Sequence, residues 1–243
     1  MRIKPCQFAW PAVLWLTFAA STLSAGSFRV APVRIDLTSH RPHSTLEISN
    51  AGTDRVTVQA EAFAWQFERD EDRLEDTDDV LVNPPIFTIE PGGTQLLRLG
   101  LREWIPGDVE RTYRVILEEV PPARRPDDIG IRTLLRISIP LFVQPNGGAS
   151  PELVWSAVQQ ADGRVALAVE NVGKQHARLR QFSVTSDDRK ETDFVMSVPT
   201  YILAGTRRLW TIDGGSLPRA RELHVRGQTE EAELHATAAV GVR

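Results

Sequence analysis

One arginine sits in a segment whose pattern could present it to a ligand. Residues 33–37 read VRIDL, so in an extended strand Arg34 and Asp36 share one face and three aliphatic side chains share the other. A guanidinium group held in this way can bind a carboxylate through two parallel hydrogen bonds. The alternative is an ordinary half-exposed strand with a weak surface ion pair, and the pattern alone favours this alternative.

Other residues that could bind a metal ion give weaker signals. His40 and His43 lie three residues apart, but Pro42 between them indicates a loop, so they are interpreted as solvated residues rather than as metal ligands. The acidic stretch 68–79 lacks the turn glycine and the closing glutamate of an EF-hand calcium loop. It is interpreted as a solvated hairpin loop.

Common enzyme motifs are absent from the sequence. It has no G-x-S-x-G elbow, no phosphate-binding glycine loop and no H-E-x-x-H pair, and the only cysteine is Cys6, near the start of the chain. We therefore expect a protein that is not an enzyme and that needs neither a cofactor nor a metal ion.

The first 25 residues have the composition of a secretory signal peptide. Arg2 and Lys4 precede an apolar run over residues 8–20, and the small residues Ser24 and Ala25 form its exit. We expect cleavage after Ala25, which leaves an exported chain without cysteine and therefore without disulfides.

The mature chain is acidic. Without Arg2 and Lys4, 26 of the 28 basic residues remain against 32 acidic ones, a net charge of −6. Because no basic stripe interrupts this balance, nucleic acid is not an expected partner. No later apolar run is long enough to cross a bilayer, so we expect no integral membrane segment in the mature chain.

Short β-type runs separated by turn residues dominate the rest of the chain. The turns include Asn-Ala-Gly at 50–52 and Pro-Gly-Gly at 91–93. Residues 145–151, PNGGASP, form the best linker and divide the chain into 26–145 and 146–243. Each part is close to the ~100 residues of one sandwich, so the sequence predicts an all-β protein of two immunoglobulin-like β-sandwich domains.

The longest strand pattern runs over residues 131–145, IRTLLRISIPLFVQP. Its combination of large aliphatic residues, arginine and a proline-rich end is typical of an edge strand. The side chains that share one face are Ile131, Thr133, Leu135, Ile137 and Ile139. An apolar edge is normally an aggregation hazard, and it is tolerated when another chain pairs with it.

Five motifs keep a fixed order in the first part of the chain. They are STLEISN at 44–50, NPPIF at 83–87, IEPG at 89–92 followed by QLLRL at 95–99, YRVILEEVPP at 113–122, and IPLF at 139–142. Together they resemble the periplasmic pilus (fimbrial) assembly chaperones of the PapD-like family. The second half resembles the family more loosely, through Trp155, Glu170-Asn171 and residues 204–208.

The resemblance implies two sandwiches in a boomerang arrangement and a mechanism of donor-strand complementation. The chaperone lends the strand before its linker to a pilus subunit that lacks its own last strand. In this chain the lent side chains would be Ile131, Thr133, Leu135, Ile137 and Ile139. The implied location is the periplasm, and the implied partners are pilus subunits and an outer-membrane usher, where strand exchange releases the subunit without ATP.

The resemblance also implies a carboxylate anchor. Arg34 matches the family arginine that holds the carboxyl terminus of the subunit, whereas the expected lysine falls on Pro140. This departure resembles the archaic branch, which serves subunits of the spore-coat-protein-U type. Arg132 or Arg136 are alternative sources of the missing charge.

A buried interdomain ion-pair network is a further family feature. By position it would consist of Arg98, Glu119 and Asp213, whose apolar flanks suit partial burial of paired charges.

The alternative function is that of a secreted structural or adhesive β-sandwich protein of the cell surface. A pilus subunit would carry a long N-terminal donor extension, whereas here Gly26 leads almost at once into the strand pattern at 28–37. We therefore expect a chaperone.

Overall fold

The computed structural model describes residues 28–105, 107–122, 133–186, 192–196, 199–212 and 221–242. These residues form strands and no helix, and none of them belongs to a helix able to cross a membrane. The strands are β1 (Phe28–Ala31), β2 (Ile35–Leu37), β3 (His43–Asn50), β4 (Val56–Glu68), β5 (Glu71–Asp76), β6 (Val80–Asn83), β7 (Ile86–Ile89), β8 (Thr94–Leu101), β9 (Arg111–Val120), β10 (Arg136–Val143), β11 (Leu153–Gln159), β12 (Val165–Asn171), β13 (Ala177–Ser186), β14 (Thr192–Met196), β15 (Thr200–Ile202), β16 (Arg207–Ile212), β17 (Glu222–Thr229) and β18 (Glu233–Val242).

The first sandwich packs two sheets face to face. One is ordered β1-β3-β8-β6 and the other β2-β10-β9-β4-β5, with β7 also paired to β4. Strands β3 and β8 bury alternate side chains, because successive residues of a strand point to opposite faces and only one face meets the other sheet. The shared core includes Leu46, Ile48, Leu97 and Leu99 from one sheet and Val58, Val115, Leu117 and Leu141 from the other.

The second sandwich is built from β11 to β18. Its strands follow the order β14-β13-β17-β18-β11-β12-β16, and β15 pairs with β13. Strand β18 joins the two halves, because it pairs antiparallel with β17 and then, over its last residues, parallel with β11. Its core contains Trp155, Leu179, Phe182 and Val225, with Trp210 packed against them.

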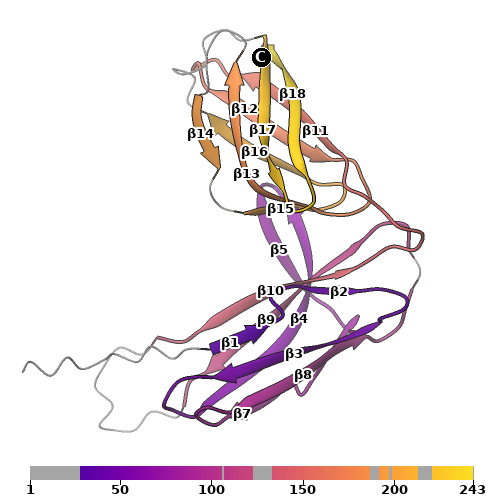
Figure 1. Cartoon of the computed structure of the whole chain (residues 1–243), viewed down its shortest axis with the longest axis vertical. Coiled ribbons are helices and arrows are strands. Elements are labelled where there is room, and N and C mark those ends of the chain that lie inside the picture. The colour runs from indigo at the N-terminus through magenta and orange to yellow at the C-terminus, as the bar shows by residue number, and fades with distance from the viewer. Residues whose placement is uncertain are drawn as a thin grey trace, which may run out of the picture.

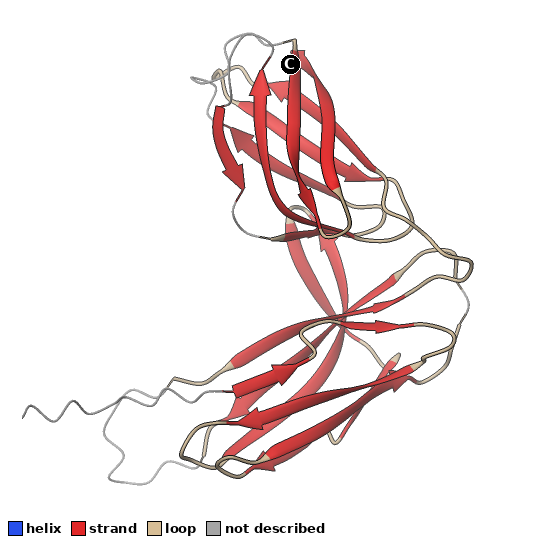
Figure 2. Ribbon diagram, viewed as in Figure 1, coloured by secondary structure: helices blue, strands red, loops and turns tan. Residues whose placement is uncertain are grey.

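The two sandwiches meet at an angle, as Figures 1 and 2 show. The linker after β10 connects them on one side, and the β4–β5 hairpin extends from the first sandwich towards the second (Figure 1). The predicted all-β architecture of two immunoglobulin-like sandwiches in a boomerang arrangement is confirmed.

The acidic stretch 68–79 forms a hairpin with mostly exposed side chains, as interpreted, but part of it is strand β5 and not loop. Strand β5 pairs antiparallel with the end of β4, and Arg69 and Asp70 form the turn between them. The pattern was hard to recognise because most β5 side chains are exposed. The hairpin is held by its neighbours on β4, where Trp65 Nε1 donates a hydrogen bond of 3.1 Å to Asp72.

Candidate binding site: a free strand edge and a charged cleft

Strand β10 has an unpaired edge over much of its length. It pairs with β9 from Arg136 to Val143, but β2 covers its other side only from Leu141 to Val143. Among the described strands, none pairs with that side at residues 136–140. The backbone of this segment can therefore add a strand from another chain, as the edge pattern of the sequence predicted.

The side chains of the expected binding face change from exposed to buried along the strand. Thr133 is exposed, Leu135 is 36% exposed, and Ile137 is partly buried against the core. Ile139 is only 2% exposed and belongs to the core of this chain. Ile131 lies outside the described residues. The expectation that Ile139 faces a partner needs correction, because the opposite sheet of the protein's own sandwich already covers it.

An apolar hollow lies beside the free edge. It is lined by Leu135 and Ile137 from the edge segment and, from the surrounding sheets, by Phe28, Ile48, Val58, Leu117 and Glu119. Leu135 is tied to β9 by its backbone, since its N–H donates to the Glu119 carboxylate at 3.3 Å and its carbonyl accepts from the Glu119 N–H at 2.9 Å. Among the described residues, the sandwich is thus open at this end, and its apolar interior continues to the surface.

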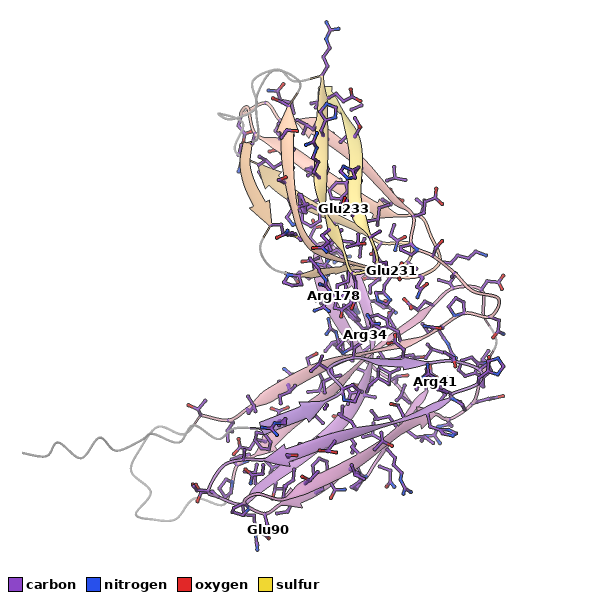
Figure 3. The ribbon with its side chains drawn as sticks, in the orientation of Figure 1. Arg34, Arg41, Glu90, Arg178, Glu231 and Glu233 are labelled. Carbon is purple, nitrogen blue, oxygen red and sulfur yellow. The ribbon has the colours of Figure 1, made fainter. Side chains whose placement is uncertain are left out.

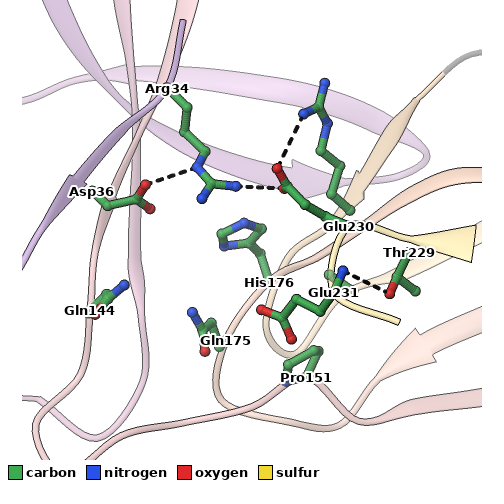
Figure 4. Close-up of a pocket in the computed structure, with 11 residues that line it drawn as sticks. Arg34, Asp36, Gln144, Pro151, Gln175, His176, Thr229, Glu230 and Glu231 are labelled. Carbon is green, nitrogen blue, oxygen red and sulfur yellow. Dashed lines mark hydrogen bonds and ion pairs between the residues drawn. The ribbon is translucent and has the colours of Figure 1, made fainter. Parts of the chain in front are cut away.

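Arg34 lies in the cleft between the sandwiches, close to Arg178 of β13 (Figure 3). Its Nε donates to Asp36 at 2.9 Å and its Nη1 donates to Glu230 at 2.6 Å, as the dashed lines in Figure 4 mark. The first contact is the ion pair that the local pattern favoured. The second joins the two sandwiches, and no local pattern indicates it because Glu230 lies 196 residues away.

Opposing effects act on the pKa of Arg34. Burial lowers it, but the carboxylates of Asp36 and Glu230 more than offset burial, so the pKa lies above its usual value. Arg178 approaches the other oxygen of Glu230, with Nη1 3.7 Å from Oε1. A cavity of ≈ 190 Å³ with a largely polar lining adjoins these residues.

Of the two candidates for the missing lysine charge, the structure describes only Arg136, which does not line the cleft. Pro140 is buried on the strand. Arg136 is exposed and pairs with Glu118 on the neighbouring strand at 3.9 Å, and Arg132 lies outside the described residues. A second cation reaches the cleft from the other domain instead, in the form of Arg178.

The joint between the sandwiches contains an aromatic cluster. Phe142 of β10 stacks on His176 at 3.7 Å between ring centroids, and Trp65 of β4 meets Tyr201 of β15 edge to face at 5.6 Å. Glu110 holds His176 through one oxygen, which accepts hydrogen bonds from the backbone N–H at 2.9 Å and lies 2.8 Å from Nδ1. The side chain of Glu110 is fully buried, so this contact is shielded from solvent.

The β4–β5 hairpin makes a second contact across the joint. Arg208 of β16 lies over the ring of Phe67 at 3.6 Å and contacts Asp72 at 2.9 Å. Arg114 of β9 lies over the ring of Trp65 at 3.7 Å. The pKa of Arg114 lies below its usual value, mainly because the guanidinium group is partly buried. Cation–π stacking of this kind fixes the hairpin against the second sandwich.

The interdomain network expected of Arg98, Glu119 and Asp213 stays a prediction, and the described residues place its first two members away from the joint. Arg98 is exposed on β8. Glu110, which contacts the second sandwich, directly precedes β9, whereas Glu119 lies near the other end of this strand. At about 3.3 Å per residue, the strand separates Glu119 from the joint by roughly 30 Å. Asp213 lies outside the described residues. The charged joint instead pairs Glu110 and Arg34 of the first sandwich with residues of the second. It also pairs Arg208 of the second sandwich with Asp72 of the first.

Several solved structures that contain a chaperone share this architecture. A chain of the CsuC–CsuE chaperone–tip adhesion subunit pre-assembly complex, from the archaic chaperone-usher Csu pili of Acinetobacter baumannii, is 20% identical, with a TM-score of 0.66 over 90% of this chain and 100% of that chain. The YadV chaperone is 17% identical, with a TM-score of 0.62 over 87% and 98% of the two chains. A chain of the Salmonella enterica SafA pilin–SafB chaperone complex is 20% identical, with a TM-score of 0.59 over 87% and 96%.

Sequence comparison gives a family. No curated protein matches the chain at a significant level. Residues 27–149, about half of the chain, match the pili and flagellar-assembly chaperones through their PapD N-terminal domain. These residues include both sheets of the first sandwich, the free edge of β10 and Arg34. The protein therefore belongs to the family of pili and flagellar-assembly chaperones.

Proposed function

We propose that the protein is a periplasmic chaperone that binds pilus subunits by lending them the free edge of β10. The observation that carries the proposal is the coincidence of an unpaired backbone edge at residues 136–140 with an apolar hollow that opens beside it. Strand addition uses both features, since backbone hydrogen bonds hold the added strand and alternate side chains fill its groove.

The groove-filling side chains are assigned to the exposed part of the strand face. Leu135 and Thr133 are accessible, and Ile137 connects them to the core. Complete burial of an exposed leucine contributes about 1.5–3 kcal/mol, before the cost of association is subtracted. Several such contacts stabilise a complex that can still exchange strands, which suits transfer of the subunit to an outer-membrane usher without ATP.

The proposal includes export and the subtype. Removal of residues 1–25 would deliver domains 26–145 and 146–243 to the periplasm, where chaperones of this family act. Pro140 in place of the expected lysine supports assignment to the archaic branch, which serves subunits of the spore-coat-protein-U type.

Substitution of Leu135 by aspartate tests this assignment. The chaperone is co-expressed with the secreted β-proteins encoded beside it, and complexes are recovered from the periplasm through a tag on the chaperone. Leu135→Asp is expected to reduce recovery of the subunit at least tenfold, because a charge would enter the apolar groove of the partner. The free variant should keep its melting temperature, since Leu135 is partly exposed.

Leu134→Asp is the matched control. Leu134 is 43% exposed, and adjacent residues of an extended segment point to opposite sides. This variant should retain its subunit. Equal capture by both variants, or recovery of every candidate subunit without the chaperone, would contradict the proposed function.

A further inference from the structure

The linker between the sandwiches contains the one asparagine of this chain that a glycine follows. The chain has four asparagines, Asn50, Asn83, Asn146 and Asn171, and the residue after Asn146 is Gly147. In an Asn-Gly pair the backbone nitrogen of the glycine can attack the side-chain carbonyl carbon of the asparagine, because glycine has no Cβ to block the approach. Whether this reaction occurs depends on how the surrounding structure holds the two groups.

The other three asparagines are protected from this reaction. Asn50 and Asn171 are 2% and 0% exposed. In both, the side-chain NH₂ group donates two hydrogen bonds to backbone carbonyls, and the side-chain oxygen accepts from the backbone. Asn83 precedes Pro84, whose ring nitrogen carries no hydrogen to lose.

Asn146 lacks these restraints. Asn146 and Gly147 are exposed and lie in a turn of the linker, which the Asn146 N–H ties to the Gly107 carbonyl at 3.1 Å. Among the described residues, none forms a hydrogen bond with the Asn146 side chain or with the N–H of Gly147. Gly147 has a φ of 83°, and a Cβ placed on it would meet no atom within 4 Å. The amide therefore has room to turn towards Gly147, and water can reach the product.

A second turn shows how a restraint changes the same pattern. Asp162 also precedes a glycine with positive φ, and an aspartic acid can form the same ring with loss of water. Here Arg164 holds both carboxylate oxygens, since its backbone N–H donates to Oδ1 at 3.0 Å and its Nε donates to Oδ2 at 2.7 Å. These hydrogen bonds lower the pKa of Asp162, so the group stays an ionised carboxylate, which is a poor electrophile.

We propose that Asn146 is a site of spontaneous covalent modification, at which the side-chain amide becomes a carboxylate. The Gly147 nitrogen loses its proton and bonds to Cγ of Asn146, and the amide nitrogen leaves with a proton as ammonia. Water then opens the cyclic succinimide at either carbonyl and gives aspartate or isoaspartate. Both products add a negative charge to the linker, and isoaspartate also adds a methylene group to the backbone that joins the sandwiches.

Incubation of the folded, full-length mature protein at mildly alkaline pH tests the site. Peptide mapping by mass spectrometry should locate the mass change of an amide-to-acid conversion at Asn146, in two forms that separate by chromatography. The rate should rise with pH, because the attacking group is the deprotonated nitrogen. A sample digested before incubation corrects for conversion during digestion. Absence of conversion at Asn146, or equal conversion at the buried Asn50 and Asn171, would overturn the proposal.

Gly147→Ala tests the attacking group. We expect conversion of Asn146 to slow at least about tenfold in this variant, because the added Cβ crowds the nitrogen beside it. Gly148→Ala is the matched control. Gly148 also has a positive φ, 79°, and open space around it, so alanine strains the backbone similarly there but leaves the attacking nitrogen unchanged. This variant should convert as the wild type does. Wild-type conversion in Gly147→Ala, or equal slowing in both variants, would exclude Gly147 as the attacking residue.

Discussion

Replacement of Ile139 by alanine is expected to lower the free energy of unfolding by about 2–5 kcal/mol, whereas Leu135→Ala should change it by less than about 1 kcal/mol. The two residues lie on one face of the same strand segment, four positions apart. Ile139 is 2% exposed in the core of the first sandwich, so its truncation leaves a cavity. Leu135 stands at the open end, where solvent can fill the space.

Denaturant unfolding of the free protein measures this difference in stability. In the subunit-recovery assay we expect the larger effect from Leu135→Ala instead. Leu135→Ala should weaken capture, while Ile139→Ala should keep capture under conditions in which the variant remains folded. Ile139→Val, which removes one methylene group, should cost about 0.5–1.5 kcal/mol and serves as an intermediate. A stable Ile139→Ala variant that fails to bind subunits would restore Ile139 to the binding face.

This contrast shows what strand periodicity can and cannot predict. Alternation correctly places Ile137 and Ile139 on one side of β10, because side chains of a strand repeat every two residues. It does not show where the protein's own core ends and the free face begins. That point depends on how far the neighbouring strands extend, and β2 covers only the last three residues of β10.

The overall architecture could be predicted because its signals are local. Regular alternation in segments such as β3 and β8, with turn residues between them, reports a half-buried strand without knowledge of its partners. The second strand of the β4–β5 hairpin was missed because its signals are not local. It is mostly exposed and is held by contacts to β4 and to Arg208, which lies 136 residues from Asp72.

The domain joint could not be recognised from local sequence. Glu110 and His176 are 66 residues apart, and each looks like an isolated polar residue in the sequence. Family position placed the charged network at Arg98 and Glu119 instead, which the structure locates on exposed or distant parts of the first sandwich. Arg34 could be singled out because Asp36 is close in sequence, but its contact with Glu230 exists only when the two domains have come together.

Glu110→Ala is expected to lower the free energy of unfolding by about 1–3 kcal/mol and to widen the distribution of domain angles. The substitution would leave the buried backbone N–H of His176 without its acceptor and would remove the group that holds the imidazole ring against Phe142. Melting curves and small-angle X-ray scattering of the free protein measure the two effects.

Glu110→Gln should have a smaller effect, because its amide oxygen can still accept the hydrogen bond from the backbone N–H of His176. Glu90→Ala, which breaks an exposed ion pair with Arg55 in the first sandwich, should cost less than about 1 kcal/mol. Equal losses in Glu110→Ala and Glu90→Ala would show that the buried contact stabilises the protein no more than a surface charge pair does, whereas a loss confined to Glu110 would establish the buried contact as the element that fixes the two sandwiches and, with them, the cleft around Arg34.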